Sequence, residues 1–105
     1  MSAEAPVVAP KIDRFLRLMT SRGASDFHLT VGRPPMLRVS GTMEPIRYRT
    51  LVEADYVDLV RPIVPPRLWE EFQATGDADL SYEVPGLARF RVNLFRQQRG
   101  SGAVF

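Results

Sequence analysis

Four arginines gather near the end of the chain, in the run LARFRVNLFRQQR. Arg89 and Arg91 alternate with apolar residues, and Arg96 and Arg99 flank the turn that follows. Residues two apart share a face of a strand, so Arg89 and Arg91 point together, away from the apolar side. A guanidinium offers a planar fork of donors that matches phosphate or carboxylate. The group therefore suits an anion or an acidic partner. The alternative is a set of surface arginines that keeps an exposed strand soluble.

His28, the one histidine, is the second candidate for chemistry. Asp26 lies two residues away on the same face of a predicted strand, so an Asp–His hydrogen bond is expected. A metal site would need more ligands, and a Ser-His-Asp triad would have to be assembled around the imidazole. A structural pair that bridges the strand to its neighbour is the preferred interpretation, and no metal site is predicted.

Three carboxylates, Asp77, Asp79 and Glu83, lie in a turn and along one strand face. Paired acids can do general acid–base work if a cleft raises the pKa of one of them. The sequence indicates no such cleft, so a solvated strand face is preferred, and no catalytic residue is predicted in this chain.

Several classes of site are excluded by composition and spacing. A P-loop needs G-x-x-x-x-G-K-[ST], but Lys11 is the only lysine and no glycine pair precedes it at that spacing. There is no cysteine, which rules out disulfides and thiolate metal sites. No apolar run is long enough to span a bilayer. The net charge of +2 argues against nucleic-acid binding, although 13 of the 14 basic residues are arginine.

The first half of the chain alternates between helical and extended patterns. Apolar residues at helical spacing predict an amphipathic helix over 11–22, ended by Gly23. The stretch 23–46 alternates at period 2 and is broken by Gly and Pro, which predicts an antiparallel meander with one buried face.

Two further helices are predicted after the meander. Thr50 and Glu53 match a capping box, with Glu53 reaching back to the N-cap. That helix should run to about Ile63, with Val52, Tyr56, Leu59 and Ile63 on its apolar face. Pro65-Pro66 then begins a third helix, which Gly76 closes.

Strands are expected over 77–84 and 87–96, and a last strand begins at Ser101. The fold class is therefore α+β, a mostly antiparallel sheet of about five or six strands with helices packed on one face. Residues 1–10 are expected to be a flexible lead-in, and 11–105 a single domain. Because the apolar run 103–105 carries no stop signal, we expect the chain to be an excised portion of a longer protein.

Two separated motifs carry a family resemblance, GASDFHLTVGRPPMLRVSG and DADLSYEVPGLARFRVNLFRQQRGSGAVF. In this order they resemble the N-terminal domain of the type IV pilus retraction ATPases, the PilT-like branch of the secretion ATPase superfamily. The resemblance covers nearly the whole chain, from the first predicted helix to Phe105. Phe27 stands where the family commonly has Leu, a conservative departure.

The resemblance implies a PAS-like domain that precedes a RecA-like core. In the family that core carries the Walker motifs, binds ATP and Mg, and forms a hexameric ring that drives pilus disassembly. The chain holds none of the core, so we expect it to be inactive alone and to contain no cofactor. The expected location is cytoplasmic, at the inner membrane through the pilus machine.

The resemblance also implies partners and site residues. The domain is expected to pack against a neighbouring subunit, and the parent protein to meet the inner-membrane platform protein of the pilus. Arg89 and Arg91 are the first candidates to approach the phosphates of the neighbour's nucleotide, followed by Arg96 and Arg99. The alternative is a stand-alone PAS-like module that holds a small ligand or a protein, with a small ligand placed between sheet and helices.

Overall fold

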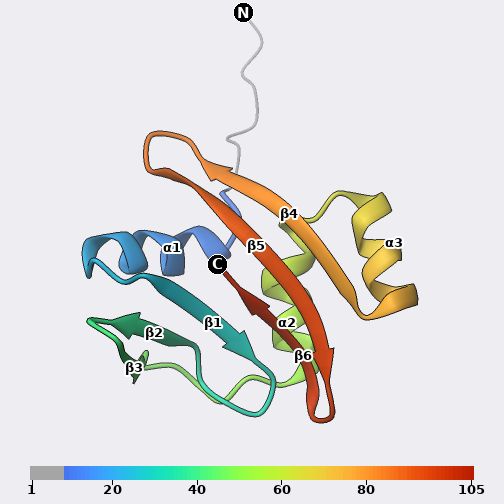
Figure 1. Ribbon diagram of the computed structural model, residues 1–105, viewed down its shortest axis with the longest axis horizontal. Coiled ribbons are helices and arrows are strands. Elements are labelled where there is room, and N and C mark those ends of the chain that lie inside the picture. Colours follow the sequence, from blue (N-terminus) through green and yellow to red (C-terminus); the bar gives the residue numbers. More distant parts are fainter. Residues whose placement is uncertain (1–8) are drawn as a thin grey trace, which may run out of the picture.

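The computed structural model describes residues 9–105, so most of the predicted lead-in lies outside the described residues. It contains three helices and one six-stranded antiparallel sheet, which confirms the α+β class (Figure 1). The helices are α1 (Ile12–Ser21), α2 (Glu53–Val60) and α3 (Pro66–Thr75), and the strands are β1 (Asp26–Thr30), β2 (Met36–Val39), β3 (Thr42–Pro45), β4 (Asp77–Val84), β5 (Ala88–Gln97) and β6 (Gly100–Val104).

The sheet order is β3-β2-β1-β6-β5-β4, so the last strand lies in the middle. β6 pairs with β5 through a short turn and with β1 from the other end of the chain. The meander β1-β2-β3 and the hairpin β4-β5 each form from neighbouring strands. β6 therefore joins two locally formed halves into one sheet.

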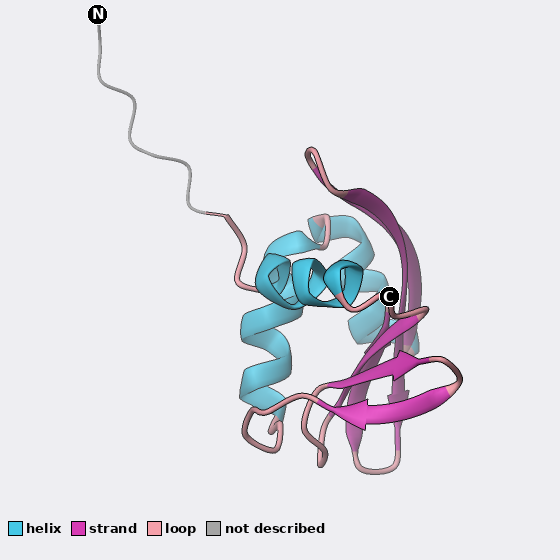
Figure 2. Cartoon of the chain, turned by 90° about the vertical axis from the view of Figure 1, so that its left-hand side faces the viewer, coloured by secondary structure: helices cyan, strands magenta, loops and turns pink. Residues whose placement is uncertain are grey.

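The helices lie together on one face of the sheet, and the other face carries none (Figure 2). Strand alternation explains the division. On β5, Phe90, Val92 and Leu94 are buried against the helices, while Arg89 and Arg91 are exposed on the opposite side. The core fills the space between the sheet and the helices.

α1 packs as its apolar spacing predicts. Ile12, Leu16 and Met19 are buried, and Gly23 follows the helix with a φ of +63°, a conformation that glycine adopts without strain. Asp13 is also buried, and its carboxylate accepts a hydrogen bond from the Tyr82 hydroxyl. Burial raises the pKa of that phenol, and the hydrogen bond to the carboxylate raises it further.

The predicted capping box of α2 is wrong. The helix begins at Glu53 with Val52 as N-cap, and the Asp55 carboxylate accepts the Val52 N–H at 2.9 Å. Val52 is 57% exposed instead of lying on the apolar face, because it precedes the helix. A hydrogen bond from Arg49 holds the pKa of Asp55 below its usual value. The helix proper ends at Val60, and one 3-10 turn carries the chain on to Ile63.

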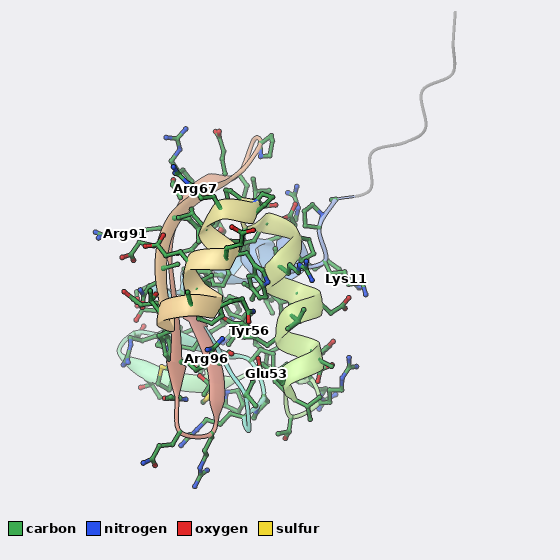
Figure 3. The ribbon with its side chains drawn as sticks, turned by 90° about the vertical axis from the view of Figure 1, so that its right-hand side faces the viewer. Lys11, Glu53, Tyr56, Arg67, Arg91 and Arg96 are labelled. Atoms are coloured by element: carbon green, nitrogen blue, oxygen red, sulfur yellow. The ribbon has the colours of Figure 1, made fainter. Side chains whose placement is uncertain are left out.

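Glu53 binds a distant strand instead of its own N-cap. Its carboxylate accepts the Ser101 N–H at 3.0 Å and the Ser101 hydroxyl at 2.7 Å. One turn later, the Tyr56 hydroxyl donates to the Gly102 carbonyl at 2.9 Å. Figure 3 shows Glu53 and Tyr56 between α2 and the sheet. The start of α2 is thereby fastened to the central strand.

Candidate functional site on the open sheet face

We call the side of the sheet that no helix covers the open face. Register and alternation assign its residues, because side chains paired across neighbouring strands point to the same side. Its members are Asp77, Asp79, Ser81 and Glu83 on β4, Arg89, Arg91, Asn93, Phe95 and Gln97 on β5, Gly100, Gly102 and Val104 on β6, Asp26, His28 and Thr30 on β1, Met36 and Arg38 on β2, and Met43 and Pro45 on β3.

Arg89 and Arg91 lie on the open face, as the alternation predicted, and both are exposed. Arg89 Nη2 lies 3.6 Å from Glu83 Oε1, a loose surface pair. Within residues 9–105 no ion pair engages Arg91, whose side chain points away from the helices (Figure 3). Together with Asp26 and Asn93, both arginines line a hollow of about 440 Å³ where β6 ends. A guanidinium placed there can meet an anion without first breaking a strong pair.

Arg96 and Arg99 do not join them. Arg96 lies on the helix-covered face, with its Cζ atom 5.0 Å from the centroid of the Phe72 ring. Arg99 lies at the turn between β5 and β6, where it is exposed. That turn begins after Gln97, six residues beyond Arg91, which is roughly 20 Å along an extended strand. The four arginines therefore divide into an outward pair, one residue on the other face, and one at the far end.

The expected Asp26–His28 hydrogen bond is absent. Asp26 Oδ2 lies 3.9 Å from His28 Nε2, too far for a hydrogen bond. Arg38, directly opposite Asp26 on β2, donates from Nε at 2.9 Å and takes that place. The cross-strand bridge is thus Asp26–Arg38, and His28 Nε2 is buried without a partner among the described residues.

The three carboxylates of β4 form an exposed strand face, as preferred from the sequence. Asn93 donates to Asp79 at 3.1 Å and, more weakly, to Asp77 at 3.4 Å. Among residues 9–105 no group of three or more His, Cys, Asp or Glu side chains could hold a metal ion. No helix in that range is long and apolar enough to cross a bilayer.

A second and larger hollow lies at the other end of the open face, with a volume of about 670 Å³. The sequence pointed to His28 and Arg99 separately but did not predict the hollow, because the hollow arises where β1 and β6, distant in the chain, become neighbours. The alternation around Met36 was the available signal, since it places this methionine on the outward side. We call it the methionine hollow; its lining residues are His28, Thr30, Val31, Arg33, Met36, Met43, Phe95, Gln97, Gln98 and Arg99.

Several curated proteins are similar in sequence. "Type IV pilus retractation ATPase PilT" of Pseudomonas aeruginosa is 43% identical over 94 residues, which is 90% of this chain and 27% of that protein. "Twitching motility protein" of Neisseria gonorrhoeae is 35% identical over 71 residues, 68% of this chain and 19% of that protein. The chain thus spans about a quarter or less of these relatives. No family model matches it.

Solved structures share the fold. The pilus retraction motor PilT, crystallised with bound ADP, superposes with a TM-score of 0.80 at 27% identity, over 92% of this chain and 28% of that one. The ATPase DotB of Legionella pneumophila gives a TM-score of 0.75 at 26% identity, over 99% of this chain and 31% of that one. In sequence and in structure, the chain is therefore homologous to the PilT-type pilus retraction ATPases over about a quarter of their length, with the fold of their N-terminal domain.

Proposed function

We propose that residues 11–105 form the PAS-like N-terminal domain of a hexameric ATPase that powers type IV pilus retraction. In this proposal a RecA-like core follows the domain in the parent protein and binds ATP and Mg. The parent works in the cytoplasm, at the inner membrane, where it meets the pilus platform protein. Support comes from the 43% identity to a retraction ATPase across 90% of the chain.

The domain's own task is to contact the neighbouring subunit and its nucleotide. The observation that carries this step is the exposed pair Arg89 and Arg91 on the rigid strand β5, with Arg91 in no ion pair within residues 9–105. Guanidinium groups that approach a transferring phosphoryl group from another subunit stabilise its developing charge. Arg99 lies at the far end of β5, and Arg96 would first have to leave the Phe72 ring. We therefore place Arg89 and Arg91 first.

The test is steady-state ATP hydrolysis by the full-length hexamer with Arg91→Ala or Arg89→Ala. A lost arginine contact of this kind lowers kcat by roughly 10³-fold. Arg67→Ala is the matched control, since Arg67 is exposed on α3, away from the open face (Figure 3). Unchanged turnover in both the Arg89 and the Arg91 variants would refute the role.

Mixing subunits tests whether the contact comes from the neighbour. One subunit carries Arg91→Ala and an intact ATP site, and the other keeps Arg91 but has its P-loop lysine replaced. If Arg91 acts across the interface, mixed hexamers regain activity that neither parent has, because intact sites then face intact arginines. Mixtures that stay inactive would assign the contact to the same subunit.

A further inference from the structure

We propose that the methionine hollow binds a small anionic molecule with a flat apolar body. This site is at the opposite end of the open face from Arg89 and Arg91, and its residues all belong to the present chain. The inference does not depend on the proposed function, because it concerns binding to this domain without ATP or neighbouring subunits.

The hollow has a largely apolar floor to which five neighbouring strands contribute. Gly102 has no side chain on the open face, and the Phe95 ring lies across it, since a Cβ atom built on Gly102 would come within 2.4 Å of the ring. Met36 and Met43 line the hollow from β2 and β3, and Thr30 from β1 between them and Phe95. An aromatic ring favours flat partners, and thioethers adapt to their outline. This arrangement suits a planar apolar group.

The charged groups of the hollow favour an anion. Arg33 and Arg99 line it from two different turns, and its lining includes no Asp or Glu. Both arginines are exposed, and within residues 9–105 neither takes part in an ion pair. Two uncompensated guanidinium groups that converge on one hollow can bind a carboxylate, sulfonate or phosphate.

Both turns are held in place by the segment that leads into α2. The Gly32 N–H donates to the Leu51 carbonyl at 2.8 Å, and the Leu51 N–H donates to the Arg33 carbonyl at 2.9 Å. On the other side, Glu53 binds Ser101, two residues after Arg99. The backbone that carries the two arginines is therefore ordered by hydrogen bonds before a ligand binds, which lowers the entropic cost of binding.

The methionine hollow has the size of a small-molecule site, but it does not lie between the sheet and the helices, where a PAS-like fold would hold a ligand. The volume of about 670 Å³ falls in the range of small-molecule sites, roughly 300–1,000 Å³. The space between sheet and helices, where the sequence-based alternative placed a ligand, is occupied by buried side chains such as Phe27, Tyr56, Phe72 and Leu94. The methionine hollow, by contrast, lies on the open face.

The probe is anilinonaphthalene sulfonate, which combines a flat aromatic body with one anionic group and fluoresces when its rings leave water. The 105-residue chain is titrated with it, and in parallel with phenylnaphthylamine, which lacks the sulfonate. Arg33→Ala/Arg99→Ala tests the charge, and Thr30→Trp fills the hollow. Ser81→Trp is the matched control, because Ser81 lies on the open face of β4 outside the hollow.

We expect saturable binding of the sulfonate to the unmodified chain. The double arginine variant should weaken it about tenfold or more and leave the uncharged probe unaffected. Thr30→Trp should abolish binding of both probes, and Ser81→Trp should change neither. Absence of saturable binding, or equal effects of Thr30→Trp and Ser81→Trp, would overturn the proposal.

Thr30→Trp is informative only if the variant folds, which its urea unfolding transition shows. If it does not fold, backbone amide chemical shifts of the unmodified chain decide the matter. Shifts on sulfonate addition that centre on Thr30, Phe95 and Arg99 would support the site. Shifts that centre on the helices or on Arg91 would overturn it.

Discussion

The face that the helices cover and the open face differ most clearly along β5, where successive side chains belong to one or the other. Val92 and Leu94 are fully buried, whereas Arg89 and Arg91, which precede them on the same strand, are exposed on the opposite side. The buried side chains of the covered face stabilise the fold. The open face carries exposed polar side chains, such as Arg91, that can bind a partner. Stability and binding can therefore be changed separately on one strand.

Leu94→Ala and Arg91→Ala should show the largest difference in the free energy of unfolding. Leu94 has no exposed surface, and truncating a buried leucine costs about 2–5 kcal/mol of the free energy of unfolding. Arg91 is exposed and outside any ion pair of residues 9–105, so its removal should change stability by no more than about 0.5 kcal/mol. Urea unfolding of the two variants measures both values. A comparable loss for Arg91→Ala would mean that its guanidinium is a structural group.

Gly102 is in contact with both faces, since the Phe95 ring lies across it on the open side and the Tyr56 hydroxyl binds its carbonyl, and Gly102→Ala tests the first of these contacts. On the open side a new methyl group would collide with the Phe95 ring, so a destabilisation of about 1–3 kcal/mol is expected. In a Phe95→Ala background the collision is gone, and alanine should be neutral or stabilising by roughly 0.5–1 kcal/mol over glycine. Thermal or urea unfolding of the double-mutant cycle gives the coupling. If Gly102→Ala costs the same in both backgrounds, Phe95 does not lie across the strand.

Local patterns were enough to predict the strands and to decide which face each side chain takes. Alternation placed Arg89 and Arg91 outward and Val92 and Leu94 inward, because a strand offers only two directions. The same parity places Arg96 with Leu94 on the covered face, where it lies over Phe72. Grouping Arg96 with Arg89 and Arg91 overlooked a signal that the sequence contained.

Long-range pairing explains what local patterns missed. Glu53 lies at capping-box spacing from Thr50, yet its carboxylate binds Ser101, 48 residues away, and Asp55 caps the helix instead. Ser101 offers the Glu53 carboxylate two donors, its N–H and its hydroxyl, where the capping box would have offered one. The methionine hollow was hidden for the same reason, since it depends on the pairing of β1 with β6. No local pattern in either strand indicates that pairing.

Of the three destabilising changes Leu94→Ala, Gly102→Ala and Tyr56→Phe, the last has the smallest expected effect, because it removes only one hydrogen bond, on the covered side of Gly102. The Tyr56 hydroxyl donates to the Gly102 carbonyl at 2.9 Å and the side chain is fully buried, so its loss should cost about 1 kcal/mol near neutral pH. Burial raises the pKa of Tyr56 above its usual value of 10.0. The stability that the protonated phenol contributes is thus complete below that value and is lost as the pH rises toward the folded-state pKa.

The difference between the unmodified chain and Tyr56→Phe should therefore shrink in alkali. About one pH unit above the unfolded-state pKa, ionisation stabilises the unfolded chain by about 1.4 kcal/mol, enough to cancel or reverse the difference. Tyr82 is present in both proteins and drops out of the comparison. Urea unfolding of the pair at neutral pH and near pH 11 measures the change. A difference that stays constant between these conditions would show that the Tyr56 hydroxyl is not withdrawn from water, and that α2 is held to β6 by Glu53 alone.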